Sequence, residues 1–319
     1  MDWVTTQGTQ FARQGQPFYL KGTNCYYLPY RTAAMREGVL DAVRAMSMNV
    51  VRTWAFQTTL EALEATLDAA RERGIYVIFT LANNWKDFGG VPEYLAKFGL
   101  SEHDEFFTNE TVAQAYRDWI TPIVDRFKKE PTVLAWELIN EPRSPKGNTE
   151  AVTSWISEMS QYIKTRDPQH LVAVGDEGWM RHRFSFGDWM TNGSTGIDQS
   201  RILELPTIDF GTYHLYPDGP WGKDAEWAAD QIREHQALAD EFQKPVLLEE
   251  YGWTDKATRD AVYAQWIATL DEVNACGDLF WMLAGPQEDG TPFYDDSYTV
   301  YQAAEIPSIT GHAQLKANA

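Results

Sequence analysis

The chain has 319 residues, 44% of them hydrophobic, which is enough apolar material for one large core or two average ones. It carries 27 Lys and Arg against 46 Asp and Glu, giving a formal net charge of −19 at pH 7. Such an acidic surface repels nucleic acid and anionic lipid, so those partners are not expected; the charge fits an uncharged ligand and equally fits a role in solubility alone.

Short apolar runs and helical patterns alternate along the chain. The sequence predicts strands over 18–24, 49–54, 75–81, 133–139, 170–174, 208–214, 246–249 and 279–283. It predicts helices over 39–47, 59–73, 111–129, 149–165, 224–242 and 255–275, with long aperiodic loops over 83–108 and 175–205. Strands that alternate with helices pair in parallel through right-handed crossovers, and about eight such units close a barrel. We therefore expect an α/β fold, a single (β/α)8 TIM barrel spanning residues 1–319, whose long βα loops form a substrate cleft.

Two of the predicted strands deliver a carboxylate to the rim of this barrel. The run from Val133 ends in Asn140-Glu141-Pro142, and Pro142 has no amide hydrogen to extend a ladder. The run over 245–252 ends in Glu249-Glu250-Tyr251-Gly252. These are the fourth and seventh strands, which lie across a barrel from each other. Glu141 and Glu250 are thus placed to flank one sugar, as the acid and the nucleophile of glycosidic cleavage require.

Neighbouring glutamates offer alternatives. Glu249 competes with Glu250, and because strand side chains alternate between faces, we expect only one of them to point into the cleft. We assign Glu250, which is nearer the rim. Glu137 shares the strand parity of Glu141, so we interpret it as a buried structural support that needs a partner.

Other polar and aromatic residues at strand ends suit roles around the two carboxylates. Arg52 lies on the second strand, where it would keep Glu250 ionised. Asn140 can hydrogen-bond the sugar 2-hydroxyl, and Tyr216 can hydrogen-bond the nucleophile. Trp281 can form the floor beneath the reacting sugar.

The sequence shows no pattern typical of a metal or cofactor site. The six His lack ligand spacing such as His-x-His, so we expect no metal and no cofactor, and interpret His214 as an orienting group rather than a base. The pair Asp295-Asp296 is expected to lie in a solvated loop. Neither a signal segment nor an apolar run near the roughly 18 residues of a membrane span is present. The sequence as it stands predicts a cytoplasmic protein, or a secreted one if a signal peptide has been removed.

Taken together, these stretches resemble glycoside hydrolase family 5, and within it the β-mannanase and β-mannosidase branch. The resemblance is carried, in the family order, by residues 49–54 (NVVRTW), 81–90 (LANNWKDFGG), 136–143 (WELINEPR), 175–178 (GDEG), 213–217 (YHLYP), 249–252 (EEYG) and 280–281 (FW). It implies Glu141 as acid/base and Glu250 as nucleophile of a retaining mechanism. It further implies a subsite for the cleaved sugar, built by Arg52, Asn140, His214, Tyr216 and Trp281. Residues that line neighbouring subsites are implied to be Trp85, Arg143, Glu177 and Trp221.

The expected activity is endo-cleavage of β-1,4-mannan or manno-oligosaccharides by a monomer. Missing disulfides and signal peptide favour two related alternatives: an exo-β-mannosidase or transglycosylase acting on short manno-oligosaccharides. A β-1,4-glucanase of the same family is a further alternative. Outside this chemistry stand a non-catalytic carbohydrate-binding barrel and a metal-dependent barrel enzyme for small molecules.

Overall fold

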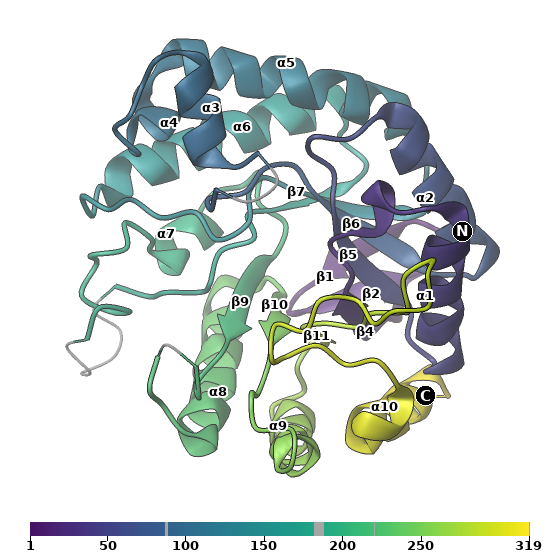
Figure 1. Ribbon diagram of the computed structural model, residues 1–319. Helices are drawn as coiled ribbons and strands as arrows, with labels where there is room; N and C mark the ends of the chain where they lie inside the picture. The colour runs from purple at the N-terminus through teal and green to yellow at the C-terminus, as the bar shows by residue number, and fades with distance from the viewer. Residues whose placement is uncertain (87–88, 182–187, 220, 319) are drawn as a thin grey trace.

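The computed structural model describes residues 1–86, 89–181, 188–219 and 221–318 of the chain. Eight parallel strands form a barrel, and helices surround it (Figure 1). The barrel strands are β4 (Leu20–Asn24), β5 (Val50–Trp54), β6 (Tyr76–Thr80), β7 (Val133–Glu137), β8 (Leu171–Ala173), β9 (Gly211–Leu215), β10 (Val246–Tyr251) and β11 (Gly277–Phe280). The predicted (β/α)8 fold is confirmed, with all eight strands in the predicted order.

The helices of the outer ring also follow the prediction, which further includes a short helical region at the C-terminus; the largest shift is in the first helix, which begins six residues before its predicted start. They are α1 (Ala33–Ala45), α2 (Leu60–Glu72), α5 (Glu110–Phe127), α6 (Thr149–Arg166), α8 (Ala225–Phe242), α9 (Arg259–Glu272) and α10 (Pro307–Ala317). The loops that were predicted as aperiodic contain three short helices: α3 (Val91–Lys97), α4 (Glu105–Thr108) and α7 (Gln199–Leu203). Residues 87–88 of the quoted stretch 81–90, and 182–187 of the second loop, lie outside the described residues.

At one seam the barrel is closed by both the backbone and the side chain of a single residue. The ladder runs β8-β7-β6-β5-β4-β11-β10-β9, which leaves β8 and β9 as the outer members. Asp209 joins them: its backbone N–H donates to the Val172 carbonyl at 2.9 Å, and its carboxylate accepts the Val172 N–H at 2.6 Å. No backbone group of Val172 is thereby left without a partner, as burial requires.

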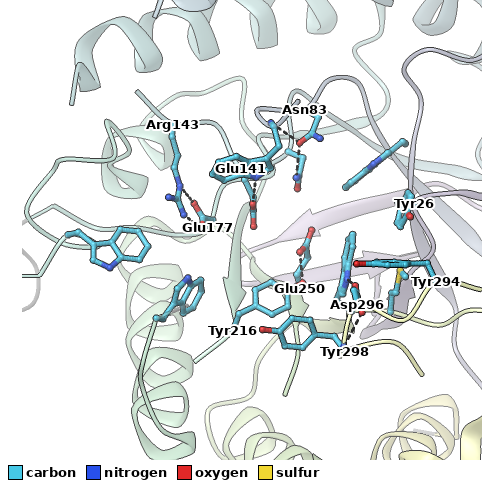
Figure 2. Close-up of a pocket in the computed structure, with 17 residues that line it drawn as sticks. Tyr26, Asn83, Glu141, Arg143, Glu177, Tyr216, Glu250, Tyr294, Asp296 and Tyr298 are labelled. Carbon is cyan, nitrogen blue, oxygen red and sulfur yellow. Dashed lines mark hydrogen bonds and ion pairs between the residues drawn. The ribbon is translucent and has the colours of Figure 1, made fainter. Parts of the chain in front are cut away.

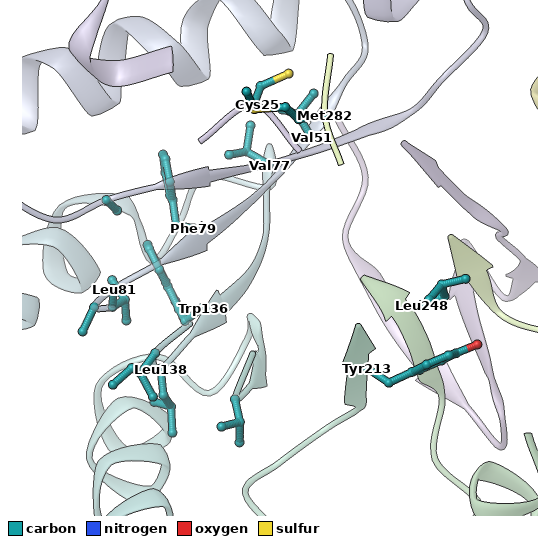
Figure 3. Close-up of a cluster of buried hydrophobic side chains, with 14 of the residues drawn as sticks. Cys25, Val51, Val77, Phe79, Leu81, Trp136, Leu138, Tyr213, Leu248 and Met282 are labelled. Carbon is teal, nitrogen blue, oxygen red and sulfur yellow. The ribbon is translucent and has the colours of Figure 1, made fainter. Parts of the chain in front are cut away.

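Large apolar side chains fill the layer between strands and helices (Figure 3). Phe79 and Trp136 on adjacent strands stack with ring centroids 6.1 Å apart, and the Trp136 indole N–H donates to Asp167 at 2.7 Å. A buried indole needs such an acceptor, since an unmade hydrogen bond costs more than the bond gains. Packing of this kind fixes each strand, and so fixes where each strand-end residue is delivered.

The sequence analysis missed a small antiparallel sheet, β1 (Val4–Gln7), β2 (Gln10–Arg13) and β3 (Gln16–Pro17). Phe11 of this sheet packs edge-on against Phe210, which precedes β9, at 5.1 Å. The sheet covers the end of the barrel where strands begin, so the open cleft lies at the end where strands finish (Figure 1). Cys25 and Cys276 are free and buried. In the part of the chain that the structure describes, no helix is both long and apolar enough to cross a bilayer.

Candidate active site

Glu141 and Glu250 meet across the open end of the barrel. Glu141 follows β7 with φ +48°, a conformation held by its N–H, which donates to the Gly175 carbonyl at 2.7 Å. Glu250 lies in β10. One carboxylate oxygen of each residue and a ring nitrogen of His214 all lie within 4.8 Å of one another. The prediction that folding brings these two distant glutamates together is confirmed (Figure 2).

His214 lies between the two carboxylates and is fully buried. Its Nδ1 is 2.8 Å from Glu141 Oε1 and 3.7 Å from Glu250 Oε2, while its Nε2 is 3.4 Å from Glu249. Burial lowers the pKa of this imidazole, but the three surrounding carboxylates outweigh burial and raise its pKa well above the ordinary value. An imidazole whose pKa is raised in this way donates to the carboxylates and is a poor proton acceptor, which agrees with the predicted orienting role.

Arg52 is the second cation of the site and is also fully buried. Its guanidinium makes two hydrogen bonds to Glu137, at 2.7 and 2.5 Å, and contacts Glu250 through Nη1. It also donates to Asn140 Oδ1 at 2.8 Å and lies 3.5 Å from Glu249. The predicted contact with Glu250 is confirmed, and so is the predicted role of Glu137 as a buried support.

The prediction that Glu250 and not Glu249 points into the cleft is confirmed, but the premise that strand alternation turns Glu249 away from the barrel interior is wrong. Both contact Arg52, and both side chains are at most 5% exposed. The register of β10 against β9 shifts between Leu248 and Glu250, and such an irregularity breaks the alternation of faces. Only Glu250 borders the cleft; Glu249 lies beneath it.

Because Arg52 pairs with three buried carboxylates, its loss will destabilise the fold. We expect Arg52→Met to lower the free energy of unfolding by about 3–5 kcal/mol, the range for a buried pair that loses one partner. The matched control is Arg71→Met, since Arg71 also pairs with two carboxylates but is 43% exposed. Arg71→Met should lower the free energy of unfolding, measured by urea denaturation, by less than about 1 kcal/mol. Equal losses in the two variants would show that the Arg52 network does not support the barrel.

The pKa directions of the two central carboxyls depend on how the cations are shared. Burial raises the pKa of Glu141, but hydrogen bonds from His214 and Trp85 outweigh it and the net direction is downward. Burial also raises the pKa of Glu250, and there it prevails over His214 and Arg52. Arg52 lowers the pKa of Glu250, the direction that was predicted for it, but burial outweighs this effect and the net pKa is raised. The physical reason is that Arg52 divides its charge among Glu137, Glu249 and Glu250.

Three more buried carboxyls make the fold sensitive to alkaline pH. Burial raises the pKa of Glu137 to about 8 despite Arg52, and burial raises the pKa values of Asp176 and Glu177 to about 7. Each folded pKa exceeds its unfolded value, so the stabilisation is complete below about pH 4 and is lost as the pH rises through 7 to 8.

We therefore expect the free energy of unfolding to fall by several kcal/mol between about pH 5.5 and about pH 8.5. Urea unfolding at the two pH values measures this directly. Glu137→Gln removes one titrating group while keeping a neutral side chain of the same shape. The free energy of unfolding of this variant should therefore fall less over the same pH range. A decline as steep as that of the parent protein would exclude Glu137 as a source of the effect.

The cleft around the carboxylates has a volume of about 670 Å³. It is lined by Tyr26, Trp54, Asn83, Trp85, Asn140, Glu141, Arg143, Glu177, Trp189, Tyr216, Trp221, Glu250, Trp281, Met282, Tyr294, Asp296 and Tyr298. Of the eleven residues assigned to the site from sequence, nine line the cleft; Arg52 and His214 lie directly beneath it. The Tyr216 hydroxyl donates to Glu250 at 2.7 Å, as predicted.

Aromatic rings form one side of the cleft (Figure 2). Trp281 stacks on Tyr26 with an angle of 8° between the rings and centroids 5.7 Å apart. The Trp281 indole N–H donates to Asp296 at 2.6 Å, which fixes the ring as a floor. Asp296 is therefore a wall residue that orients Trp281, and the prediction of a solvated loop is wrong for it.

The other side of the cleft is built around Arg143. Its guanidinium makes two hydrogen bonds to Glu177, at 2.7 and 2.6 Å, and lies over the rings of Trp85 and Trp189 at 5.2 and 5.0 Å. Trp85 in turn donates its indole N–H to Glu141 at 2.6 Å. Aromatic rings thus occur on both sides of the pair Glu141 and Glu250.

The sequence analysis missed several residues that line the cleft: Tyr26, Trp189, Met282, Tyr294, Asp296 and Tyr298. They stand in loops, where neither the helical nor the strand period applies. Tyr26 follows the end of β4 by two residues, so a slightly wider list of strand-end residues would have included it. The others carried no usable signal beyond being aromatic residues in long loops.

Glu141, His214 and Glu250 are also the three described residues whose donor atoms come close enough for a shared cation. Their positions are already explained by direct contacts: His214 donates to Glu141, and Arg52 holds Glu250. A metal would have to compete with the guanidinium and the charged imidazole for these oxygens. The residues present therefore fit acid–base chemistry better than a metal centre.

Comparisons with known proteins agree with this geometry. The model of the family "GH family 5 beta-mannosidase-like" matches residues 52–275. A probable mannan endo-1,4-beta-mannosidase A of Aspergillus clavatus is 34% identical, covering 95% of this chain and 87% of the relative. The crystal structure of an endo-1,4-beta-mannanase from Rhizomucor miehei is 33% identical with a TM-score of 0.92, covering 99% of this chain and 100% of that one.

Other solved structures extend the likeness. An endo-beta-1,4-mannanase from Thermotoga petrophila is 34% identical with a TM-score of 0.88, covering 95% of this chain and 77% of that one. A family 5 mannosidase from Rhizomucor miehei has a TM-score of 0.78 at 19% identity, covering 99% of this chain and 98% of that one, and shares the fold alone. Family model, sequence relatives and barrel geometry coincide, and the chain belongs to glycoside hydrolase family 5, in its β-mannosidase-like group.

Proposed function

We propose that the protein is a retaining glycoside hydrolase that cleaves β-1,4-mannosidic bonds within mannan or manno-oligosaccharides. The separation of the two carboxylates supports this most directly. Oxygens of Glu141 and Glu250 lie within 4.8 Å of each other, whereas inverting enzymes hold their carboxyls about 6.5–9.5 Å apart to admit a water. The relatives named above as endo-mannanases supply the choice of mannan.

Cleavage proceeds in two displacements. In the first, Glu250 attacks the anomeric carbon, the bond to the leaving oxygen breaks, and Glu141 gives that oxygen its proton. In the second, Glu141 takes a proton from a water molecule, the water attacks the anomeric carbon, and Glu250 leaves as a carboxylate. Tyr216 and Arg52 hydrogen-bond Glu250 and stabilise the charge it regains.

The proton must reside on Glu141 at the start, although its pKa is lowered in the free site. Trp85 contributes to that lowering by donating to Glu141 Oε2. A glycosidic oxygen that takes up the Glu141 proton competes with the indole for the same carboxylate. Loss of the indole hydrogen bond raises the pKa of Glu141, and substrate binding thereby favours the acid form.

Endo action follows from walls on both sides of the pair. Tyr26 and Trp281 lie on one side, and Arg143 and Trp189 lie on the other, so sugars can be bound in both directions from the cleaved bond. An exo enzyme needs one closed end beside the sugar that is released.

Hydrolysis of linear mannan, mannohexaose and cellulose side by side, with and without a chelator, tests the proposal. We expect mixed manno-oligosaccharides from mannan, little product from cellulose, and no effect of the chelator. Mannose as sole product would indicate an exo-β-mannosidase, and rapid cellulose cleavage a glucanase. Loss of activity in the presence of the chelator would indicate a metal-dependent barrel enzyme. Binding of the oligosaccharides without turnover would indicate a non-catalytic carbohydrate-binding barrel.

A further inference from the structure

The side of the cleft that accepts the leaving group ends in a rigid wall. The Arg143 guanidinium lies between the rings of Trp85 and Trp189 and is held by both oxygens of Glu177. Trp85 also hydrogen-bonds Glu141, the proposed acid, which must touch the glycosidic oxygen. The wall therefore stands on the side toward which the leaving sugars extend.

A second cavity adjoins this wall, and we call it the outer pocket. Its volume is about 520 Å³, comparable with the roughly 670 Å³ of the catalytic cleft. It shares Trp85, Arg143 and Trp189 with the cleft, so the two cavities adjoin each other at this wall. Its other sides are formed by Lys86, His103, Pro145, Ser194 and Thr195.

The outer pocket is built from four loops that are hydrogen-bonded to one another. Buried Ser144 donates its hydroxyl to Asp104 at 2.7 Å, and its N–H to the Thr195 carbonyl at 2.7 Å. The Arg143 N–H donates to Asn84 at 3.2 Å. Gly196 permits this packing, because a Cβ there would lie 2.5 Å from the Ser144 Cβ, and its φ is +73°. A cavity fixed in this way needs little ordering when a ligand binds.

The chemistry of the lining suits a pyranose ring. Trp85 is 42% exposed, so part of its indole is available for packing against the C–H face of a sugar. Exposed Lys86 and Ser194 stand at the sides of the pocket, where an ammonium and a hydroxyl can hydrogen-bond sugar hydroxyls. Apolar surface with a few polar groups is the usual composition of a small-molecule site.

We propose that the outer pocket binds the third mannosyl unit of the main chain on the leaving-group side of the cleaved bond. The first leaving unit lies beside Glu141 and Trp85, the second lies over the Arg143 wall, and the third enters the outer pocket. The position of the outer pocket directly beside the cleft, with three lining residues in common, favours a linear chain over a side branch. This assignment rests on the mannan-cleaving activity proposed above.

Cleavage of mannopentaose in water enriched in oxygen-18 tests the assignment. The label enters the new reducing end, which belongs to the product from the non-reducing side. Binding with three leaving units labels mannobiose, whereas binding with two labels mannotriose. The protein is expected to label mainly mannobiose. Lys86→Ala removes a charged hydrogen-bond donor, and Ser194→Trp fills the space that the sugar would occupy. Each change should lower the ratio of labelled mannobiose to labelled mannotriose about fivefold or more.

Lys129→Ala is the matched control, because Lys129 is an exposed lysine in the turn before β7, at the opposite end of the barrel. Its ratio should equal that of the parent protein. An unchanged ratio in both pocket variants, with cleavage intact, overturns the outer pocket alone. An effect limited to galactosyl-branched oligosaccharides overturns the main-chain assignment. Absence of any mannopentaose cleavage by the parent protein instead counts against the proposed function.

Discussion

Replacement of Glu250 by Ala is expected to lower kcat on mannohexaose by about 10⁴-fold or more, because no other group can form the covalent intermediate. Binding of mannohexaose, measured by calorimetry, should persist, since Trp281 and Tyr26 stack independently of this carboxylate. Added azide should restore turnover by attacking the anomeric carbon from the vacated side. The product of that rescue is α-mannosyl azide, whose configuration identifies the position that Glu250 occupied.

Glu249→Gln is the matched control for this experiment. Glu249 is adjacent in sequence, equally buried, and contacts the same Arg52, but it lies beneath the cleft. Its change should lower kcat by no more than about 10²-fold, the scale of a disturbed hydrogen bond in the site. Strong activity in Glu250→Ala together with loss in Glu249→Gln would reverse the assignment of the nucleophile.

Replacement of Glu141 by Ala is expected to slow cleavage of mannohexaose by about 10²–10⁴-fold, the usual contribution of a general acid. The loss should depend on the leaving group, because a sugar alkoxide needs a proton and a dinitrophenolate does not. With 2,4-dinitrophenyl β-mannoside, the initial burst of phenolate should persist at a rate within about tenfold of the parent protein. Rapid-mixing absorbance measurements separate this burst from the slow steady state.

The surface variant Glu72→Ala serves as control, since Glu72 has a side chain that is 76% exposed on α2. It should change neither rate. An equal loss on mannohexaose and on the dinitrophenyl substrate in Glu141→Ala would remove Glu141 from the role of acid.

The barrel and its two carboxylates could be predicted because both follow from periodicity. Fully buried strands read as short apolar runs, and eight such runs separated by helical patterns specify the barrel. Glu141 could be placed because Pro142 ends the run that delivers it. Arg52 could be paired with Glu250 because it was the one cation among the residues expected at the ends of the predicted strands.

Other features depend on interactions that periodicity does not encode. The strands β1 to β3 have four, four and two residues, too few for a repeating pattern to be recognised. Glu249 turns inward through a local shift in strand register, which only tertiary packing decides. Asp296 is in a loop, and its role depends on the hydrogen bond that it accepts from the indole N–H of Trp281. Arg52 shares its charge among three carboxylates, and this arrangement likewise depends on tertiary packing.

The configuration of the first sugar product tests the central claim most directly. Proton NMR during the first minutes of mannohexaose hydrolysis distinguishes the two anomers before they equilibrate in solution. Two carboxylates as close as Glu141 and Glu250 require a covalent intermediate and therefore two inversions at the anomeric carbon. The account predicts that the β-anomer appears first; initial release of the α-anomer would contradict it.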